Sequence, residues 1–313
     1  MPAYTSFVPG KIILFGEHAV VYGESAIAVP ITQVRARATI LPKISKEPGK
    51  VEIEAPDIGM RTTLSDLPKD DPIASAIYGV MEYLEIKRIP SCHLKISSTI
   101  PVASGLGSGA AVSVAIIRTL AGFLGQPLSN EEVSKLAYEV EIIHHGTPSG
   151  IDNTVVTYEK PVFFTKDQAI EIFTIKNPFT IIIGDTGIPS PTKKTVGDVR
   201  ASWASDRERI KQLFSAIGSI SRNAKQIIET GLTDQLGPLM DENHLILQEI
   251  GVSSPKLDRM VKAAKNAGAL GAKLSGAGRG GNMIALVHQG QTEEVRREIR
   301  QSGAVNTIIT NVN

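Results

Sequence analysis

The sequence is poor in cysteine, in aromatic residues and in net charge. Cys92 is the single cysteine, which excludes an intrachain disulfide and a zinc site built on cysteines. Phe, Trp and Tyr together make up 5% of the chain, so the core must be aliphatic. Lys and Arg number 33 against 32 Asp and Glu, which excludes a global positive field for nucleic acid, although not a local basic patch. We expect no nucleic-acid partner.

A long hydrophobic run is also missing. The longest apolar stretch, residues 110–124, is interrupted by Ser113, Arg118, Thr119 and Gly122, and it is shorter than the roughly 20 residues that a membrane-spanning helix needs. The opening residues, MPAYTSFVPGK, have no apolar signal-peptide core. We therefore expect a cytoplasmic protein in a reducing compartment, with no membrane partner.

What is present is the composition of a soluble globular protein, with 42% hydrophobic and 21% charged residues in 313. At roughly 150 residues per domain, this length predicts two domains. Short strand-like and helix-like segments alternate in the first half, and long helical patterns prevail after residues 176–178. We therefore expect an α/β (α+β) protein with domains at residues 1–177 and 178–313.

Periodicity and capping residues predict the individual elements. Ser129 and Glu132 form a capping-box pattern that opens a helix, and Val133, Leu136, Val140 and Ile143 then follow at helical spacing up to Gly146. Further helices are expected at residues 72–84, after the glycines of 105–109, and at 199–217, 220–230, 233–250, 254–267 and 292–302. The helix at 254–267 has Ser254 as its expected N-cap and Pro255 at its first position. Strands are expected at residues 11–15, 33–41, 93–100, 161–165, 179–184, 272–275, 283–287 and 306–311.

Residues 101–111 are the clearest candidate for a binding segment. Gly105, Gly107 and Gly109 let the backbone turn sharply and approach a ligand, and an Ala-rich helix follows at once. The free N–H groups and the dipole at the start of that helix favour an anion such as phosphate. A tight turn before a core helix is the alternative. The candidate residues are Pro101, Val102, Ala103, Ser104, Gly105, Leu106, Gly107, Ser108, Gly109, Ala110 and Ala111.

Two carboxylates lie eleven residues apart across the end of the helix that Ser129 opens. Glu141 lies on its last turn, off the face formed by Val133, Leu136 and Val140, and Asp152 lies in the Pro/Gly loop beyond it. One could hold a divalent cation and the other could orient or deprotonate a hydroxyl. The alternative, which spacing alone favours, is a solvated helix end with an Asp that caps a loop.

Two further segments carry polar residues beside glycines. Lys11 lies at the edge of an apolar strand that ends at Gly16, followed by Glu17 and His18; the lysine either extends to the surface or pairs with a carboxylate, and a single such histidine is usually structural. Gly276, Gly278 and Gly281 match G-x-G-x-x-G, but a strand follows them, which argues against a Rossmann fingerprint. This loop is either a generous hairpin turn or lies against a nucleotide or the first glycine-rich loop.

Together these segments resemble the GHMP small-molecule kinases over most of the chain. The resemblance rests on P-G-K-I-I-L-F-G-E-H-A-V-V-Y-G at residues 9–23, the glycine-rich segment at 101–111, H-G-T-P-S-G-I-D-N at 145–153 and K-L-S-G-A-G-R-G-G-N at 273–282. The first motif is most similar to that of the mevalonate kinases. The resemblance implies an N-terminal domain like domain 2 of ribosomal protein S5, a ferredoxin-like C-terminal domain and an active site between them.

The resemblance also implies the reaction and its residues. It implies transfer of the ATP γ-phosphoryl group to the 5-hydroxyl of mevalonate, with ATP and Mg²⁺ as cofactors, and a homodimer. Asp152 matches the catalytic aspartate and Lys11 its partner lysine, Glu141 matches the magnesium-binding glutamate, and residues 101–111 match the phosphate loop. Glu17, His18 and, on weaker evidence, Thr192 match positions on the substrate side.

The chain departs from the family pattern at two places. The family usually has Ser-Ser-Ala in the phosphate loop, where its second Ser binds magnesium, but this chain has Ser108-Gly109-Ala110; Ser108, a water molecule or Glu141 alone could serve instead. Arg279 interrupts the usual run of glycines, and Asn282 stands where Cys is common. Arg279 either contacts ATP phosphates or points to solvent.

Two other functions fit the same motifs. A phosphomevalonate kinase would need extra basic residues for its anionic substrate, and Lys193 and Lys194 beside Thr192 could supply them. A nucleotide sensor without activity would have no need of Lys11, Glu141 and Asp152.

Overall fold

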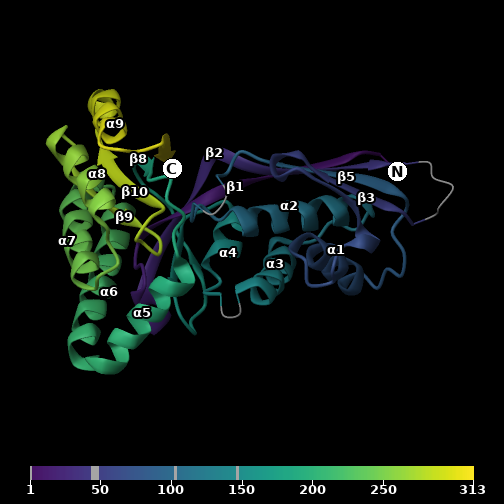
Figure 1. The fold of residues 1–313 in the computed structure, drawn as a ribbon, viewed down its shortest axis with the longest axis horizontal. Coiled ribbons are helices and arrows are strands. Elements are labelled where there is room, and N and C mark those ends of the chain that lie inside the picture. Colours follow the sequence, from purple (N-terminus) through teal and green to yellow (C-terminus); the bar gives the residue numbers. More distant parts are fainter. Residues whose placement is uncertain (1, 44–48, 102–103, 146–147) are drawn as a thin grey trace. The chain divides into compact units, whose positions relative to one another are not determined.

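The computed structural model describes residues 2–43, 49–101, 104–145 and 148–313 (Figure 1). The chain forms two compact units. The first unit comprises residues 1–10, 34–101 and 107–159, and the second comprises residues 11–33, 102–106 and 160–313. The long strands β1 (Tyr4–Phe15) and β2 (Ser25–Pro42) contribute to both units. The expected boundary at residues 177 and 178 falls within the second unit, and the division into domains 1–177 and 178–313 remains a prediction.

The first unit is a mixed sheet with four helices. The strands β4 (Met60–Thr63), β3 (Val51–Ala55) and β5 (Cys92–Ser98) follow one another in the sheet, and β5 pairs antiparallel with the second half of β2. Strand β3 runs parallel to β5 and antiparallel to β4. The helices lie together beside these strands (Figure 1) and are α1 (Pro72–Tyr83), α2 (Ser108–Phe123), α3 (Asn130–His145) and α4 (Ile151–Tyr158). Short 3₁₀ helices lie at Pro56–Ile58 and Leu64–Asp66.

Local sequence signals explain where two of these helices begin. Asp71 caps α1 by accepting hydrogen bonds from the N–H groups of Ile73 and Ala74, and Pro72 occupies its first turn. The expected capping box forms before α3: the Ser129 N–H donates to Glu132 Oε2 over 2.7 Å, and the Glu132 N–H donates to Ser129 Oγ over 3.3 Å. Both predicted helices are confirmed.

Two expectations at the end of α3 are wrong. Ile143 is half exposed rather than on the buried face, whereas Glu141 is buried beside Val140 and one turn after Ala137. Asp152 lies in the first turn of helix α4, not in a loop. Gly150, with φ of +84°, turns the chain at the start of that helix. The short α4 escaped the sequence analysis because a Pro/Gly segment precedes it.

The second unit contains a four-stranded antiparallel sheet in the order β11-β8-β10-β9. Its strands are β8 (Phe179–Asp185), β9 (Gly271–Ser275), β10 (Asn282–Val287) and β11 (Asn306–Val312). Helix α8 (Pro255–Asn266) precedes β9, and α9 (Thr292–Gln301) joins β10 to β11. This β-α-β-β-α-β path, in which the first strand lies between the fourth and the third, is the expected ferredoxin-like arrangement.

The remaining helices of the second unit correct one prediction. They are α5 (Thr192–Ser205), α6 (Arg207–Thr230) and α7 (Leu236–Glu249), with a 3₁₀ turn at Thr233–Gln235. The expected break near residue 218 is wrong, because α6 continues through Gly218 and the chain bends instead at Asp206, which caps α6. Glycine serves packing there: a Cβ on Gly218 would overlap the carboxylate of Glu24, which accepts hydrogen bonds from Ser215 and Arg222. The short strands β6 (Val162–Thr165) and β7 (Glu171–Ile172) and two 3₁₀ helices, η1 (Ala19–Tyr22) and Gln289–Gln291, also lie in this unit, with β6 pairing with the start of β2.

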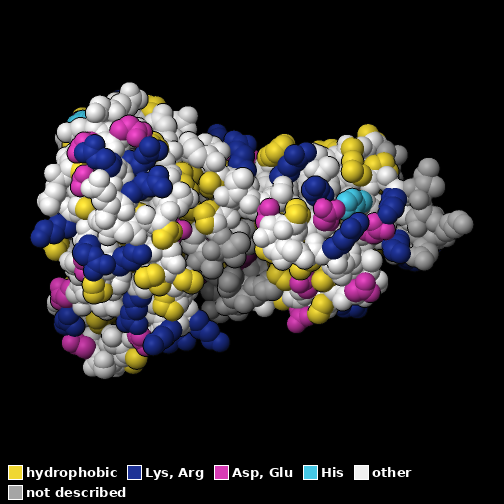
Figure 2. Space-filling view, turned by 45° about the horizontal axis from the view of Figure 1, so that its top comes forward, with side chains coloured by type: hydrophobic (Ala, Val, Ile, Leu, Met, Phe, Trp, Pro, Cys, Tyr) yellow, Lys and Arg dark blue, Asp and Glu magenta, His cyan; other side chains and the backbone are white. Residues whose placement is uncertain are grey.

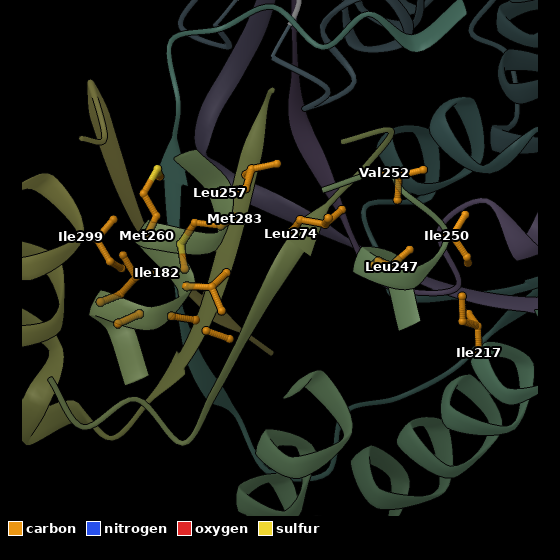
Figure 3. Packing of buried hydrophobic residues seen from close by; sticks show 14 of the residues in the cluster. Ile182, Ile217, Leu247, Ile250, Val252, Leu257, Met260, Leu274, Met283 and Ile299 are labelled. Atoms are coloured by element: carbon orange, nitrogen blue, oxygen red, sulfur yellow. The ribbon is translucent and has the colours of Figure 1, made fainter. Parts of the chain in front are cut away.

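The core of the second unit is mainly aliphatic, as expected. Figure 3 shows residues of one buried cluster that joins the sheet to α6, α7, α8 and α9, among them Ile182, Leu274, Met283, Ile217, Leu247, Leu257, Met260 and Ile299. Tyr22, Trp203 and Phe214 form an aromatic stack at its margin, with ring centroids 4.6 to 5.6 Å apart. Ser254 caps α8, as predicted.

The surface matches the balanced charge of the sequence. Figure 2 shows acidic and basic side chains interspersed on the visible face. Among the described residues, no helix has the length and the apolar character needed to cross a membrane.

Candidate active site

Four hydrogen bonds bring three of the sequence motifs together in the second unit. The Lys11 N–H donates to the Leu106 carbonyl over 3.0 Å, and Ser275 Oγ donates to the Ile13 carbonyl over 2.7 Å. His18 Nε2 lies 3.0 Å from the Ala277 carbonyl, and Asn282 Nδ2 donates to the Ser104 carbonyl over 2.6 Å. The loop after β9 therefore lies against both the first motif and the first glycine-rich segment, which was one of the two expectations for it.

The glycine-rich segment has the backbone of an anion-binding turn. Gly105 and Gly107 adopt positive φ values of 80° and 73°, which favour glycine. Gly107 is the N-cap of α2 and has no side chain to cap it, so the first N–H groups of α2 are open to a ligand. Ser108 is the first residue of α2, Gly109 is exposed, and Ala110 and Ala111 are buried. Pro101 and Ser104 are described, but Val102 and Ala103 lie outside the described residues.

Within the first unit, Glu141 lies beside the start of α2. A Cβ on Gly109 would stand 3.4 Å from Glu141 Oε1, so this carboxylate oxygen is next to the second residue of the helix. Glu141 is buried, which excludes the solvated helix end considered from spacing. No group of three His, Cys, Asp or Glu side chains that could enclose a metal ion occurs in the described part of the chain. One carboxylate beside an anion site instead fits Mg²⁺, which protein sites typically hold through one or two carboxylates and the substrate phosphates.

Asp152 lies near the same helices. It is the second residue of α4, which packs against both α2 and α3 in the first unit, and it is partly exposed. The carboxylate oxygens of Asp152 can accept a hydrogen bond from a ligand.

Sequence reasoning missed the buried ion pair of the second unit. Lys273 on β9 and Glu17 are 0% and 1% exposed, and Lys273 Nζ donates to Glu17 Oε1 and, over 2.8 Å, to the Leu274 carbonyl. Burial raises the pKa of Glu17 and lowers that of Lys273, and the pairing opposes both shifts. A lone lysine in the strand Gly271–Ser275, which is otherwise free of charge, was the available signal.

His18 is held in its neutral form. It is buried and adopts a positive φ of 61°, and burial lowers its pKa to about 4, with the nearby Arg279 charge acting in the same direction. Because the Ala277 carbonyl can only accept a hydrogen bond, Nε2 is the donor and Nδ1 carries no proton. His18 therefore holds the loop after β9 through its Nε2–H, and its uncharged Nδ1 is a hydrogen-bond acceptor.

The predictions for Arg279 and Thr192 rested on weaker evidence. Arg279 makes an ion pair with Asp198 and donates through Nε to the Gly251 carbonyl over 3.1 Å, so it is paired with protein groups rather than pointing freely to solvent. Thr192 is the exposed first residue of α5. Ser190, just before it, donates to the Gly278 carbonyl over 2.9 Å, which attaches the start of α5 to the loop after β9.

Comparison with known proteins supplies the family context for this geometry. The model of the GHMP kinases N terminal domain matches residues 74–160, and that of the GHMP kinases C terminal domain matches residues 223–305. A mevalonate kinase of Pyrococcus horikoshii is 37% identical over 96% of this chain and 93% of the relative, and one of Pyrococcus furiosus is 38% identical over the same shares. The crystal structure of the L. major mevalonate kinase in complex with R-mevalonate matches with a TM-score of 0.84 and 29% identity, over 99% of this chain and 95% of that one.

Proposed function

The chain belongs to the GHMP kinase family, and the two Pyrococcus relatives named above are mevalonate kinases. We propose that it transfers the γ-phosphoryl group of ATP to the 5-hydroxyl of mevalonate. The products are 5-phosphomevalonate and ADP, a step of isoprenoid biosynthesis. The structural observation that carries the proposal is the uncapped start of α2 after a glycine turn, with a buried carboxylate beside it. This is a site for nucleotide phosphates and their cation.

Phosphoryl transfer needs positioning and charge neutralisation more than covalent chemistry by the protein. We assign the N–H groups at the start of α2 and the hydroxyl of Ser108 to the ATP phosphates. Glu141, with Ser108 and water, would hold Mg²⁺, which supplies positive charge next to the transferring phosphoryl group. Because Gly109 carries no hydroxyl, we expect a water molecule to complete the cation's ligands on that side.

We assign Asp152 to the acceptor hydroxyl, which it orients by accepting its hydrogen bond. Lys11, whose positive charge favours the ionised form of that hydroxyl, is assigned as its partner. Glu17, His18 and Thr192 are assigned to the mevalonate side. For Glu17, the support is that Oε2 is buried and has no hydrogen-bond partner among the described residues, which leaves an acceptor for a substrate hydroxyl.

A phosphomevalonate kinase remains the second candidate, because Lys193 and Lys194 occupy the exposed first turn of α5 next to Thr192. Coupled release of ADP with Mg²⁺-ATP separates the two when mevalonate and 5-phosphomevalonate are offered in separate reactions. Turnover on mevalonate alone is expected. Turnover on the phosphorylated acid alone would overturn the assignment, and turnover on neither would favour a nucleotide sensor.

Assembly and location are proposed on the family resemblance. We propose a cytoplasmic protein that forms a homodimer. Sedimentation velocity at micromolar concentration tests the second part, for which a species of 33.5 kDa would be the contrary result.

A further inference from the structure

Asn282 is a buried amide whose hydrogen bonding is only half satisfied. It is the first residue of β10 and is 2% exposed. Its Nδ2 donates to the Ser104 carbonyl over 2.6 Å, while its Oδ1 has no partner among the described residues. Leaving a buried polar atom unpaired costs about 1–3 kcal/mol. The stability of the fold therefore does not explain why an asparagine stands at this position. The hydrogen bond from Nδ2 to the Ser104 carbonyl must serve another purpose.

That bond attaches the glycine-rich segment to the sheet of the second unit. Ser104 is buried, and a Cβ built on Gly281 would lie 3.6 Å from its carbonyl oxygen. Gly281 is itself fixed, because its N–H donates to the Ile188 carbonyl and its carbonyl accepts from Thr186. The side-chain amide of Asn282 is therefore attached to a backbone that hydrogen bonds at the N–H and the carbonyl of Gly281 hold in place.

A second carbonyl of the same segment is also anchored. The Lys11 N–H donates to the Leu106 carbonyl over 3.0 Å. In a planar trans peptide, the N–H of the next residue points opposite to the carbonyl. Since the carbonyls of Ser104 and Leu106 point at Asn282 and Lys11, the N–H groups of Gly105 and Gly107 point away from these two anchors. Along the chain they come directly before the N–H groups at the start of α2.

We propose that Asn282 is a positioning residue for nucleotide binding: by holding the Ser104 carbonyl, it directs the N–H groups of the glycine-rich segment toward the phosphates of ADP and ATP. This rests on the proposed function only for the use of ATP. Asn282 touches neither the acceptor nor its hydroxyl in this account. Its loss should weaken the binding of nucleotide and leave the Michaelis constant for mevalonate unchanged.

The test compares two Asn282 variants with a matched control. Asn282→Leu keeps the branched shape and the number of side-chain heavy atoms and removes the donor, and Asn282→Ala covers the case in which the larger leucine disturbs packing. Thr310→Val is the control, because Thr310 is buried in β11 of the same sheet and its hydroxyl has no partner among the described residues. The dissociation constant of ADP is measured by titration calorimetry, at a temperature at which circular dichroism shows each variant folded.

Both Asn282 variants are expected to bind ADP about five- to tenfold more weakly, the loss expected for one hydrogen bond, and the control is expected to bind as the unaltered protein does. Unchanged ADP affinity in the Asn282 variants would overturn it, as would an equal loss in Thr310→Val. Turnover on mevalonate is measured alongside. If the unaltered protein binds ADP but does not phosphorylate mevalonate, the substrate assignment fails, while the effect on ADP still decides the role of Asn282.

Discussion

Lys273 and Glu17 form an ion pair that is buried away from solvent. The lysine lies in strand β9 and the glutamate in the first motif, more than half of the chain earlier in the sequence. A buried pair of this kind adds little stability in itself, since the cost of removing both charges from water offsets their attraction. The pairing does, however, make each charged side chain depend on the other for compensation of its buried charge. Removal of one leaves an uncompensated charge in the core.

The first prediction follows from this dependence. Lys273→Met should lower the free energy of unfolding by about 3–5 kcal/mol, and the combined variant Lys273→Met/Glu17→Gln should recover most of that loss. Urea unfolding followed by circular dichroism measures both. Because burial raises the pKa of Glu17, the loss in the single variant should shrink as the pH falls and the carboxyl takes up a proton. A combined variant no more stable than the single one would contradict this interpretation of the pair.

The second prediction concerns Asp152. Asp152→Ala should lower kcat by at least about 10²-fold, the lower end for a positioned acid–base group, with little change in the melting temperature because the side chain is partly exposed. Glu159→Gln is the matched control. It removes a carboxylate charge at the other end of α4, where Glu159 pairs with Arg118, and it should leave kcat unchanged. Steady-state kinetics decides, and near-normal turnover of Asp152→Ala would refute the assigned role.

A third prediction uses the buried His18. Its pKa lies at about 4 in the folded protein, below the ordinary value of 6.5, so the unfolded chain binds more protons as the pH falls from 6.5 to 4. The stability contributed by the neutral ring is complete above pH 6.5, decreases through this window, and is lost below pH 4. The decrease should reach about 3 kcal/mol.

His18→Asn should flatten that slope, because asparagine is polar and does not titrate. Part of the slope should remain, since burial also lowers the pKa of His244. Unfolding curves in urea at several pH values provide the measurement. An equal slope in the two proteins would show that His18 is not the titrating group.

The fourth prediction addresses Gly109. A serine at this position would place its Cβ 3.4 Å from Glu141 Oε1, so its hydroxyl could become a further oxygen ligand of a cation held by Glu141. Gly109→Ser should lower the concentration of Mg²⁺ needed for half-maximal activity and tighten Mn²⁺ binding followed by electron paramagnetic resonance. Gly109→Ala, which adds the same Cβ without an oxygen, is the control. Equal titrations of the serine and alanine variants would count against a cation at this position.

Local signals in the sequence predicted the elements that carry their own caps. Ser129 and Glu132 mark α3 and Ser254 marks α8, because these contacts lie within four residues of one another. The cap that Asp71 provides for α1 is equally local but was not predicted. The strands β3 and β4 were missed, and β1 and β2 are longer than expected. Strand β3 does alternate, with Val51, Ile53 and Ala55 buried and two glutamates between them, so it could have been predicted. Strand β4, Met-Arg-Thr-Thr, has no such alternation and is stabilised by its pairing with β3.

The same distinction holds for the candidate site. The glycine turn before α2 could be predicted, since Gly105 and Gly107 act through their own backbone. The roles of Lys273 and Asn282 could not, because each depends on a contact with a residue more than 170 positions away. The helix break predicted near Gly218 is wrong for a related reason: the missing side chain of this glycine accommodates Glu24 and does not end a helix.

The most direct test of the central claim is the identity of the phosphorylated product. The protein is incubated with Mg²⁺-ATP and R-mevalonate, and the reaction is followed by proton-coupled ³¹P nuclear magnetic resonance. A phosphomonoester signal split into a triplet by the adjacent methylene group is predicted, because the 5-hydroxyl is on a primary carbon. An unsplit ester signal would place the phosphoryl group on the tertiary 3-hydroxyl, and the absence of any ester signal while the protein binds ATP would contradict a mevalonate kinase.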